Sequence, residues 1–498
     1  MNNLMLSKRF LPLFITQFFG AFNDNVFKNA LVILVTYKIA ANDSATSAQL
    51  VNLAPGLFVL PTLLFSYLSG QLADKIDRAQ VARLVKGAEI VLAVIGSVGL
   101  YLNSVPILLL TLFGFGTHSA FFGPVKYAIL PQHLREDELV TGNGYIEAGT
   151  FLAILSGTIL GGVLILTNSG VTMLAAIMIG VAVFGYLASR QIPTAPAPVP
   201  DLKWAFNPVR ETIHLIRYSS GRADEFRCIL GISWFWFIGA LVLAQFSPFA
   251  KDVLRADASV VTLFLVMFSI GIAVGSLLCA KLIKGVVRAT PVPLGALGMT
   301  IFAVDLYLTS RQGMPLADSP LLGAATFLKQ SFGQHILVDL LGLAICGGIY
   351  IVPLYALLQV RADPQHGARA IASNNLMNAV FMLVAAVLAM GCIKLGMTVP
   401  QIFLLAAILN AGVGIYICKL LPFPLMGALL KLLYRVEVRG LENWEKAGDR
   451  VLIVANHTAF LDAAILAAFL PERVGFAINT FIAQSPMLRP FLKLLDTY

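Results

Sequence analysis

The sequence predicts an all-α membrane protein that crosses the bilayer twelve times, in two six-helix halves, and then continues into the beginning of an α/β domain. Three observations predict this architecture. First, 58% of the 498 residues are hydrophobic and only 12% are charged, whereas a soluble domain carries about 25% charged residues. Second, long apolar segments recur along the chain, and one long polar segment divides them into two equal groups. Third, the apolar segments stop after residue 422.

Twelve apolar segments are long enough to span a bilayer as helices, which requires about 20 mostly apolar residues. They lie at approximately residues 10–38, 53–73, 84–103, 105–130, 143–166, 171–189, 228–250, 259–283, 291–310, 335–359, 370–393 and 400–421. An even number of spans places both ends of the bundle on the same side of the membrane.

The charges of the loops predict the orientation. Lysine and arginine accumulate on the side that also holds the N-terminus, and cytoplasmic loops carry such an excess, so we expect both termini in the cytoplasm. The net charge of +9 is explained in the same way and does not indicate a nucleic-acid partner. The five cysteines lie in or beside apolar runs without metal-ligand spacing. We therefore expect free, buried thiols, no metal and no cofactor.

These features divide the chain into four segments. Residues 1–190 form the first six-span half, 191–227 a cytoplasmic linker, 228–422 the second half, and 423–498 the N-terminal part of a further domain. The linker opens with PTAPAPVPD and continues with the amphipathic stretch KWAFNPVRETIHLIRYS. Short internal similarities suggest related halves. PVKYAILPQHLRED in span four parallels VPLYALLQVRADPQ in span ten, and GNGYIEAGTF in span five parallels ASNNLMNAVF in span eleven.

Polar residues interrupt the first span, FFGAFNDNVFKNALVILV. Asp24 and Lys28 lie four residues apart, so they share a helix face and can form a buried, purely structural pair. Gln17, Asn23 and Asn25 spread polarity around the rest of the helix. A charge at the centre of a bilayer costs at least about 2.5–3.5 kcal/mol, so such groups face a partner or a wet cavity. The spread of polarity favours a cavity.

Spans four and five add Lys126 and Glu147. Lys126 is near the predicted cytoplasmic end of its span, where it can also snorkel to the interface. An ammonium facing carboxylates would complement a head group with a phosphate and an amine: Lys126 would bind the phosphate, and Asp24 or Glu147 the amine. We rank these three residues first for substrate binding, with Asn25 and Lys28 beside them. The other polar residues within spans are His118, Asn143, Gln245, Asp305, Asn374, Asn375 and Asn378. Of these, we expect His118 to serve helix packing and Asp305 to pair locally.

Two six-span halves joined by a long cytoplasmic linker resemble the layout of the major facilitator superfamily. The segment Gly70-Gln71-Leu72-Ala73-Asp74-Lys75-Ile76-Asp77-Arg78, between spans two and three, resembles the loop signature G-x-x-x-D-[RK]-x-G-R of that superfamily. The resemblance implies a conformational latch made by Asp74 and Arg78, in which the aspartate faces a helix N-terminus of the other half. The chain departs from the signature at Asp77, where the family has glycine. The corresponding loop of the second half, GSLLCAKLIKGVVR, lacks the acidic residue.

The C-terminal segment has a different character. LMGALLKLLYRV is typical of an amphipathic interfacial helix, and VEVRG and VLIVAN are typical of short strands. The following Asn456-His457-Thr458-Ala459-Phe460-Leu461-Asp462 resembles the N-H-x4-D signature of glycerolipid acyltransferases. The resemblance implies that His457 is a general base for a glycerol hydroxyl and that Asp462 orients it. The family's downstream arginine and E-G-T blocks are absent before Tyr498, so we expect acyl transfer only if the protein continues beyond that residue.

QFFGAFNDN in span one and PVKYAILP in span four resemble the bacterial lysophospholipid transporters, here joined to an acyltransferase signature as in fusions with 2-acylglycerophosphoethanolamine acyltransferase. The resemblance implies inward movement of lysophospholipids across the bacterial inner membrane and their re-acylation in the cytoplasm, with acyl-carrier protein as a possible partner. It also implies that Asp24 is the aspartate of span one and Lys126 the head-group lysine. Span seven departs from the family, because CILGISWFWFIGALVLAQFSPF has no basic gate residue.

Two other function classes remain open. A proton-coupled exporter of drugs or small solutes would use the same fold, with Asp24 and Glu147 carrying protons. A lipid-modifying enzyme with a membrane anchor is the third hypothesis, but twelve spans with buried charges are more than an anchor needs. The acyltransferase signature favours a lipid substrate over a drug.

Overall fold

The computed structural model describes residues 4–39, 44–283, 287–311, 321–363, 365–420, 422–434, 436–440, 443–444, 451–456, 461–470 and 475–477. Within them, the bundle consists of α1 (Leu11–Leu34), α2 (Ser44–Lys75), α3 (Arg78–Leu102), α4 (Val105–His133), α5 (Glu136–Leu164), α6 (Gly170–Ser189), α8 (Ala223–Leu243), α10 (Ala258–Ile283), α11 (Pro291–Ser310), α13 (Ser331–Arg361), α14 (Gly367–Lys394) and α15 (Val399–Leu420). Each corresponds to one predicted span.

Eleven helices in the described residues are long and apolar enough to cross a membrane, and α1 is the bundle helix that is not among them. Its 24 residues include Gln17, Asn23, Asp24, Asn25 and Lys28, which lower its hydropathy. It nevertheless packs along α5 and α6 as part of the first half. The prediction of an all-α membrane protein with two six-helix halves is therefore confirmed, and eleven of the twelve predicted spans have the length and hydropathy of a membrane span in the described residues.

The two halves use the same packing scheme. In the first half α1 packs on α5, α2 on α4 and α3 on α6; in the second half α8 packs on α14, α10 on α13 and α11 on α15. Numbered within each half, the pairs are first with fifth, second with fourth and third with sixth in both cases. The contacts between halves are also reciprocal, because α2 packs on α14 and α5 packs on α10.

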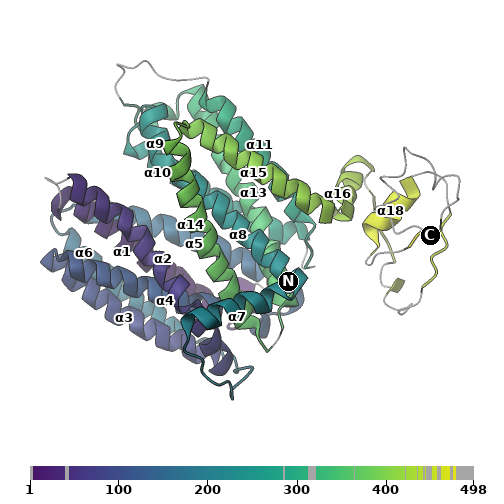
Figure 1. The fold of residues 1–498 in the computed structure, drawn as a ribbon, viewed down its shortest axis with the longest axis horizontal. Coiled ribbons are helices and arrows are strands. Elements are labelled where there is room, and N and C mark those ends of the chain that lie inside the picture. Colours follow the sequence, from purple (N-terminus) through teal and green to yellow (C-terminus); the bar gives the residue numbers. More distant parts are fainter. Residues whose placement is uncertain are drawn as a thin grey trace.

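The halves converge at the end of the bundle where α7 (Pro208–Ser220) lies, and diverge away from it (Figure 1). α7 contacts α2 of the first half and both α8 and α14 of the second. One hydrophobic core runs through both halves and includes Phe10, Ile129 and Tyr355. A second core, around Phe27, Leu112 and Met178, belongs to the first half alone. The core is thus shared between halves on the α7 side and separate at the opposite end of the first half.

The remaining elements are short. η1 (Leu4–Leu6) precedes α1, and a turn of π-helix, η2 (Val35–Ile39), extends it. The seventh span breaks after α8 into α9 (Phe246–Pro248) and the π-helical turn η3 (Phe249–Val253), where Pro248 has no N–H to continue a helical ladder. α12 (Ala324–Phe327) precedes α13. The predicted amphipathic linker helix begins at Pro208, where Asn207 caps it through the Arg210 N–H.

The C-terminal segment is described in part. α16 (Pro422–Tyr434) follows α15 and contacts α18 (Leu461–Phe469). The prediction of strands in VEVRG and VLIVAN is wrong for the residues that the structure describes, because 436–440 and 451–456 have no regular secondary structure. A β-rich composition alone does not form a strand when no partner strand satisfies its backbone groups.

The cysteines are free in the structure. Cys228, Cys279 and Cys392 are buried, as predicted, whereas Cys346 and Cys418 are only partly buried. The prediction of five buried thiols is therefore wrong for these two.

Candidate functional site

A cluster of ionisable side chains is buried between α1, α3 and α4 of the first half. We call Asp24, Lys86, Glu89 and His118 the buried charge cluster. Lys86 Nζ lies 2.5 Å from Glu89 Oε2, and His118 Nε2 lies 3.2 Å from the same oxygen. His118 Nδ1 is 3.8 Å from Asp24 Oδ1. The imidazole thus stands between two carboxylates from different helices.

Small and amide residues of α1 make room for this cluster. A Cβ on Gly20 would overlap Lys86 Nζ, so glycine at this position leaves room for the ammonium beside α1. Asn23 donates to Glu89 Oε1 over 3.1 Å and to the Met178 carbonyl over 3.2 Å. The interruption of the first span therefore serves a charged partner on α3.

Asp24 does not pair with Lys28. Its Oδ2 accepts a hydrogen bond of 3.1 Å from Ser119, and its Oδ1 faces His118. Lys28 Nζ instead lies 5.3 Å from the ring centroid of Phe58 on α2, in a cation–π contact. The (i, i+4) spacing put both groups on one face, but the neighbouring helices supply better partners.

Sequence reasoning missed Lys86 and Glu89. Both lie in the predicted third span, three residues apart within KGAEIV, and both are almost fully buried. The sequence did contain an indication of this pair, because a basic and an acidic residue three positions apart lie on the same face of a helix. His118 was expected to serve helix packing; it contacts the carboxylates of two other helices instead.

Lys126 and Glu147 lie where α4 and α5 face the second half. Glu147 is buried and accepts a hydrogen bond from the Tyr127 hydroxyl. Lys126 is half-buried, and its Nζ lies 4.8 Å from the Tyr127 ring centroid. Within the described residues Lys126 has no ion pair, so its ammonium is available to an anion.

Paired side chains join the halves next to Lys126. The Tyr127 ring stacks on Tyr355 of α13, with centroids 4.4 Å apart and planes within 5°. Asn143 of α5 donates to Gln359 Oε1 over 2.6 Å, and Gln359 donates to the Tyr127 carbonyl over 3.1 Å. These contacts hold α4 and α5 against α13 on the α7 side. Tyr127 and Tyr355 are also the tyrosines that the two similar sequence segments align.

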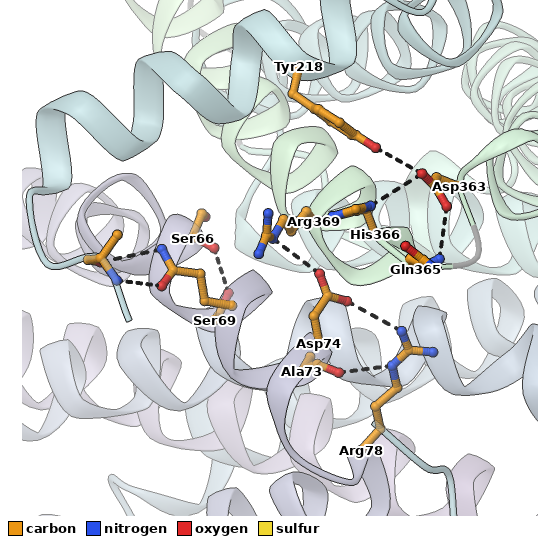
Figure 2. Close-up of polar contacts among 12 residues, drawn as sticks. Ser66, Ser69, Ala73, Asp74, Arg78, Tyr218, Asp363, Gln365, His366 and Arg369 are labelled. Atoms are coloured by element: carbon orange, nitrogen blue, oxygen red, sulfur yellow. Dashed lines mark hydrogen bonds and ion pairs between the residues drawn. The ribbon is translucent and has the colours of Figure 1, made fainter. Parts of the chain in front are cut away.

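Asp74, at the C-terminal end of α2, bridges the two halves (Figure 2). Its Oδ1 is 3.4 Å from Arg78 Nη2 of its own half, and its Oδ2 is 3.3 Å from Arg369 Nε in the first turn of α14. Arg78 also donates to the carbonyls of Ala73 and Ala128. Asp74 therefore faces a helix N-terminus of the other half, as the loop signature implies; its role as a latch remains a prediction.

The α2–α3 turn accommodates the departure at Asp77. This residue has φ −49° and caps α3, because its Oδ1 accepts from the Ala79 and Gln80 N–H groups. Its Oδ2 accepts from Ala195 N–H of the linker over 3.1 Å. No left-handed residue is needed, so glycine is not required here. An aspartate instead ties the linker to the turn.

Asp363 organises the α13–α14 loop beside the latch (Figure 2). Its carboxylate accepts from Gln365 N–H, Arg222 and the Tyr218 hydroxyl over 3.0, 2.9 and 3.2 Å, and lies 3.3 Å from His366 Nδ1. The Gln365 N–H and the Arg222 guanidinium hold the pKa of Asp363 well below its usual range. The carboxylate is therefore ionised throughout the physiological range, and it joins α7 to the second half.

The other predicted residues lie apart from this region or in local contacts. Asn25 donates to the Ala21 carbonyl of its own helix, and Gln17 accepts from Thr150 of α5. Asn378 accepts from Ser233 of α8. Asp305 contacts His335 locally, as expected. The structure shows Asn374 and Gln245 buried, and Asn375 next to Gly123 of α4.

The predicted catalytic pair of the C-terminal segment is described only for Asp462, in the first turn of α18. His457 lies outside the described residues. The structure therefore gives no geometry for this pair.

Two family models match the chain. The model for the major facilitator superfamily matches residues 13–324, and an acyltransferase model matches residues 435–498. The first match covers the first half and the second half through α11, and the second match covers the segment that contains α18.

Curated relatives and solved structures match over most of the chain. The lysophospholipid transporter LplT of Pectobacterium carotovorum is 31% identical over 407 residues, 79% of this chain and 89% of that protein. That of Klebsiella pneumoniae is 30% identical over 390 residues, 77% of this chain and 88% of that protein. The transporter FucP, in an outward conformation, superposes with a TM-score of 0.60 at 14% identity, over 82% of this chain and 97% of that one. A bacterial homologue of the iron transporter ferroportin superposes with a TM-score of 0.57 at 14% identity, over 81% of this chain and 98% of that one. The structural matches show the fold alone.

Proposed function

The chain belongs to the major facilitator superfamily, as a multi-pass transporter with an acyltransferase-type segment behind it, and we propose that it transports lysophospholipids such as lysophosphatidylethanolamine. Movement runs from the outer to the inner leaflet of the bacterial inner membrane, with both termini in the cytoplasm. The names of its relatives support this substrate class. The acyltransferase segment supports a lipid destined for re-acylation, and acyl-loaded acyl-carrier protein is the partner that we propose as the acyl donor.

The state of Lys126 is the observation that carries the proposal. The two carboxylates ranked with it for substrate binding have partners: Glu147 has Tyr127, and Asp24 has Ser119 and His118. Within the described part of the chain, the Lys126 ammonium contacts an aromatic face and forms no ion pair. A half-buried ammonium without an ion pair is suited to bind an anion, and a phosphodiester supplies one together with an amine for Glu147 or Asp24. We assign Asn25 and Lys28, further along α1, to the same path.

Alternating access is the mechanism that we propose from the contacts between the halves. Side chains join the halves on the α7 side, through Asp74 with Arg369, Asn143 with Gln359, and Tyr127 with Tyr355. We propose that this is the cytoplasmic side, that it opens when the Asp74–Arg78 latch releases, and that the lysolipid enters from the opposite side. Rocking of two related halves about a central site is the usual mechanism of this architecture.

The acyltransferase chemistry is proposed for His457 and Asp462. His457 would remove the proton from the free glycerol hydroxyl of the transported lysolipid, and Asp462 would orient the imidazole. Acyl transfer to lysolipid by the whole protein tests this role. Retained transfer in His457→Ala would overturn it.

The test of transport is uptake of labelled lysophosphatidylethanolamine into proteoliposomes. Lys126→Ala is expected to lower uptake by about tenfold or more, because a charge-assisted contact contributes about 1.5–3 kcal/mol. Lys126→Arg should restore part of it. Lys394→Ala, at the exposed end of α14, is the matched control and should behave as wild type. Uptake by Lys126→Ala at the wild-type rate would contradict the binding role of Lys126. Absence of uptake by the wild type would contradict the proposed function.

A second candidate is proton-coupled export of drugs or small solutes. It is favoured by the buried charge cluster, in which His118 stands 3.2 Å from Glu89 and 3.8 Å from Asp24 inside the bundle, because ionisable side chains of neighbouring membrane helices commonly form proton relays in transporters. Proton flux in the same vesicles distinguishes the two: export of a non-lipid solute driven by a pH gradient, without lysolipid uptake, would favour the exporter.

A further inference from the structure

A second group of ionisable residues lies in the other half, at the end of the bundle away from α7. His335 is in the first turns of α13, Asp339 lies one turn later, and Asp305 is near the end of α11. His335 Nε2 is 3.0 Å from Asp305 Oδ2 and 3.8 Å from Asp339 Oδ1. One potential ligand atom from each of the three residues lies within 4.8 Å of the other two.

Asp339 is the unusual member of this group. Its side chain is 1% exposed. In the described part of the chain, neither carboxylate oxygen has a hydrogen-bond partner. Thr309 and Asp305 approach it, but without the geometry of a hydrogen bond. A buried carboxylate without a hydrogen bond is costly in a protein interior. Its position against His335 and Asp305 therefore points to a positively charged ligand.

The helices that carry the three residues are held at a fixed distance. A Cβ on Gly342 of α13 would lie 2.5 Å from the Phe302 ring of α11, and a Cβ on Gly298 of α11 would lie 2.4 Å from Cys346 Sγ of α13. Such close packing of α11 on α13 supports the helices on which the three side chains stand. His335 is 50% exposed and leaves access from the surface.

From this geometry we propose that Asp305, His335 and Asp339 bind a divalent first-row transition cation, of the Zn²⁺ or Mn²⁺ type. One imidazole and two carboxylates form a mixed nitrogen and oxygen set, which suits these ions, whereas Ca²⁺ and Mg²⁺ prefer oxygen ligands only. Ligand distances of about 2.0–2.2 Å are reached by small side-chain rotations, with water completing the shell. The cation neutralises Asp339 and joins α11 to α13. The site is separate from Lys126 and does not depend on the identity of the transported lipid.

The test is calorimetric titration of the purified full chain, without a histidine tag and treated with EDTA, with ZnCl2 and MnCl2. One of these ions is expected to bind with a stoichiometry of one and to raise the unfolding temperature. Asp339→Asn and His335→Ala are expected to weaken binding at least tenfold. Co²⁺ at the same site should give the absorption of a coordinated ion, and the same two variants should abolish it.

Two variants distinguish cation binding at this group from non-specific binding and from unfolding. His214→Ala, on α7, removes a histidine from another part of the surface and should bind the cation as the wild type does. His335→Ala changes a half-exposed residue, so it reports on the site even if Asp339→Asn does not fold. Absence of saturable binding to the wild type, or equal binding by wild type and His335→Ala, would overturn the proposal and leave protonation as the state of Asp339.

Discussion

Single residues explain how the first half contains four ionisable groups without exposing them. Lys86 is fully buried, and three contacts stabilise it: the Glu89 carboxylate, the Phe122 ring 5.0 Å away, and the space left by Gly20. Glu89 in turn is shared by Lys86, His118 and Asn23. Glu89 is therefore the residue on which the neutralisation of the cluster depends.

Glu89→Gln tests this dependence. The substitution leaves Lys86 buried without a counter-ion, and breaking a buried pair in this way costs about 3–5 kcal/mol. We expect a marked drop in the unfolding temperature of the detergent-solubilised protein, and recovery of most of it in Glu89→Gln/Lys86→Met. Glu136→Gln, at an exposed position of α5, is the control and should unfold as the wild type. Equal destabilisation of the single and double variants would show that the stability depends on the shape of the Glu89 side chain and not on its charge.

The sequence indicated which residues of span one are candidates for a functional role, but it did not predict their partners. Asp24 was identified because a carboxylate is expensive in lipid. Its assignment to Lys28 relied on helical spacing, which describes one helix, whereas Ser119 and His118 come from another. Lys86 and Glu89 were overlooked because hydropathy averages over a helix and does not indicate which face meets a neighbour.

At the level of elements, the spans and the amphipathic helix now seen as α16 were predictable, whereas the strands expected in the C-terminal segment were not observed. An apolar run of about 20 residues has one solution in a bilayer, since a helix satisfies its own backbone. A short β-like stretch depends on a partner strand, and residues 436–440 and 451–456 are not strands. The turn between α2 and α3 was predictable from its motif. Asp77 stands where the motif has glycine, and its side chain caps the N-terminus of α3.

The contact between α2 and α14 depends on Gly70. A Cβ there would lie 3.0 Å from Ala372 Cβ and 3.3 Å from Arg369 Cα, so the helices touch at this position. Gly70→Leu should prevent the halves from closing on the α7 side and lower lysolipid uptake by at least about tenfold, since overpacking typically costs about 1–3 kcal/mol. The matched control is Gly56→Leu on the same helix, where a Cβ meets no atom within 4 Å. Normal uptake by Gly70→Leu would show that closure at this contact is not required.

At the level of the whole molecule, two related halves account for both the packing and the site. The same helix pairs recur in each half, and contacts between halves are reciprocal. The stacked rings of Tyr127 and Tyr355, aligned by the sequence similarity, lie where such a relation brings equivalent residues together. The halves differ where function needs asymmetry, because Lys126 is matched by Leu354, and Asp74 has no acidic counterpart.

This asymmetry makes Asp74 the residue that should set the balance between states of the transporter. Asp74→Asn removes the charge between Arg78 and Arg369 and should shift the population away from the state closed on the α7 side by about tenfold, the effect of about 1.4 kcal/mol. Spin labels at the exposed Gln80 and Gln365, one in each half, with the native cysteines replaced, would report the change as a longer distance. Asp137→Asn, which loses only the exposed pair with Arg135, is the control and should keep the wild-type distribution. An unchanged distribution in Asp74→Asn would mean that the apolar contacts between the halves, and not this carboxylate, hold the α7 side closed.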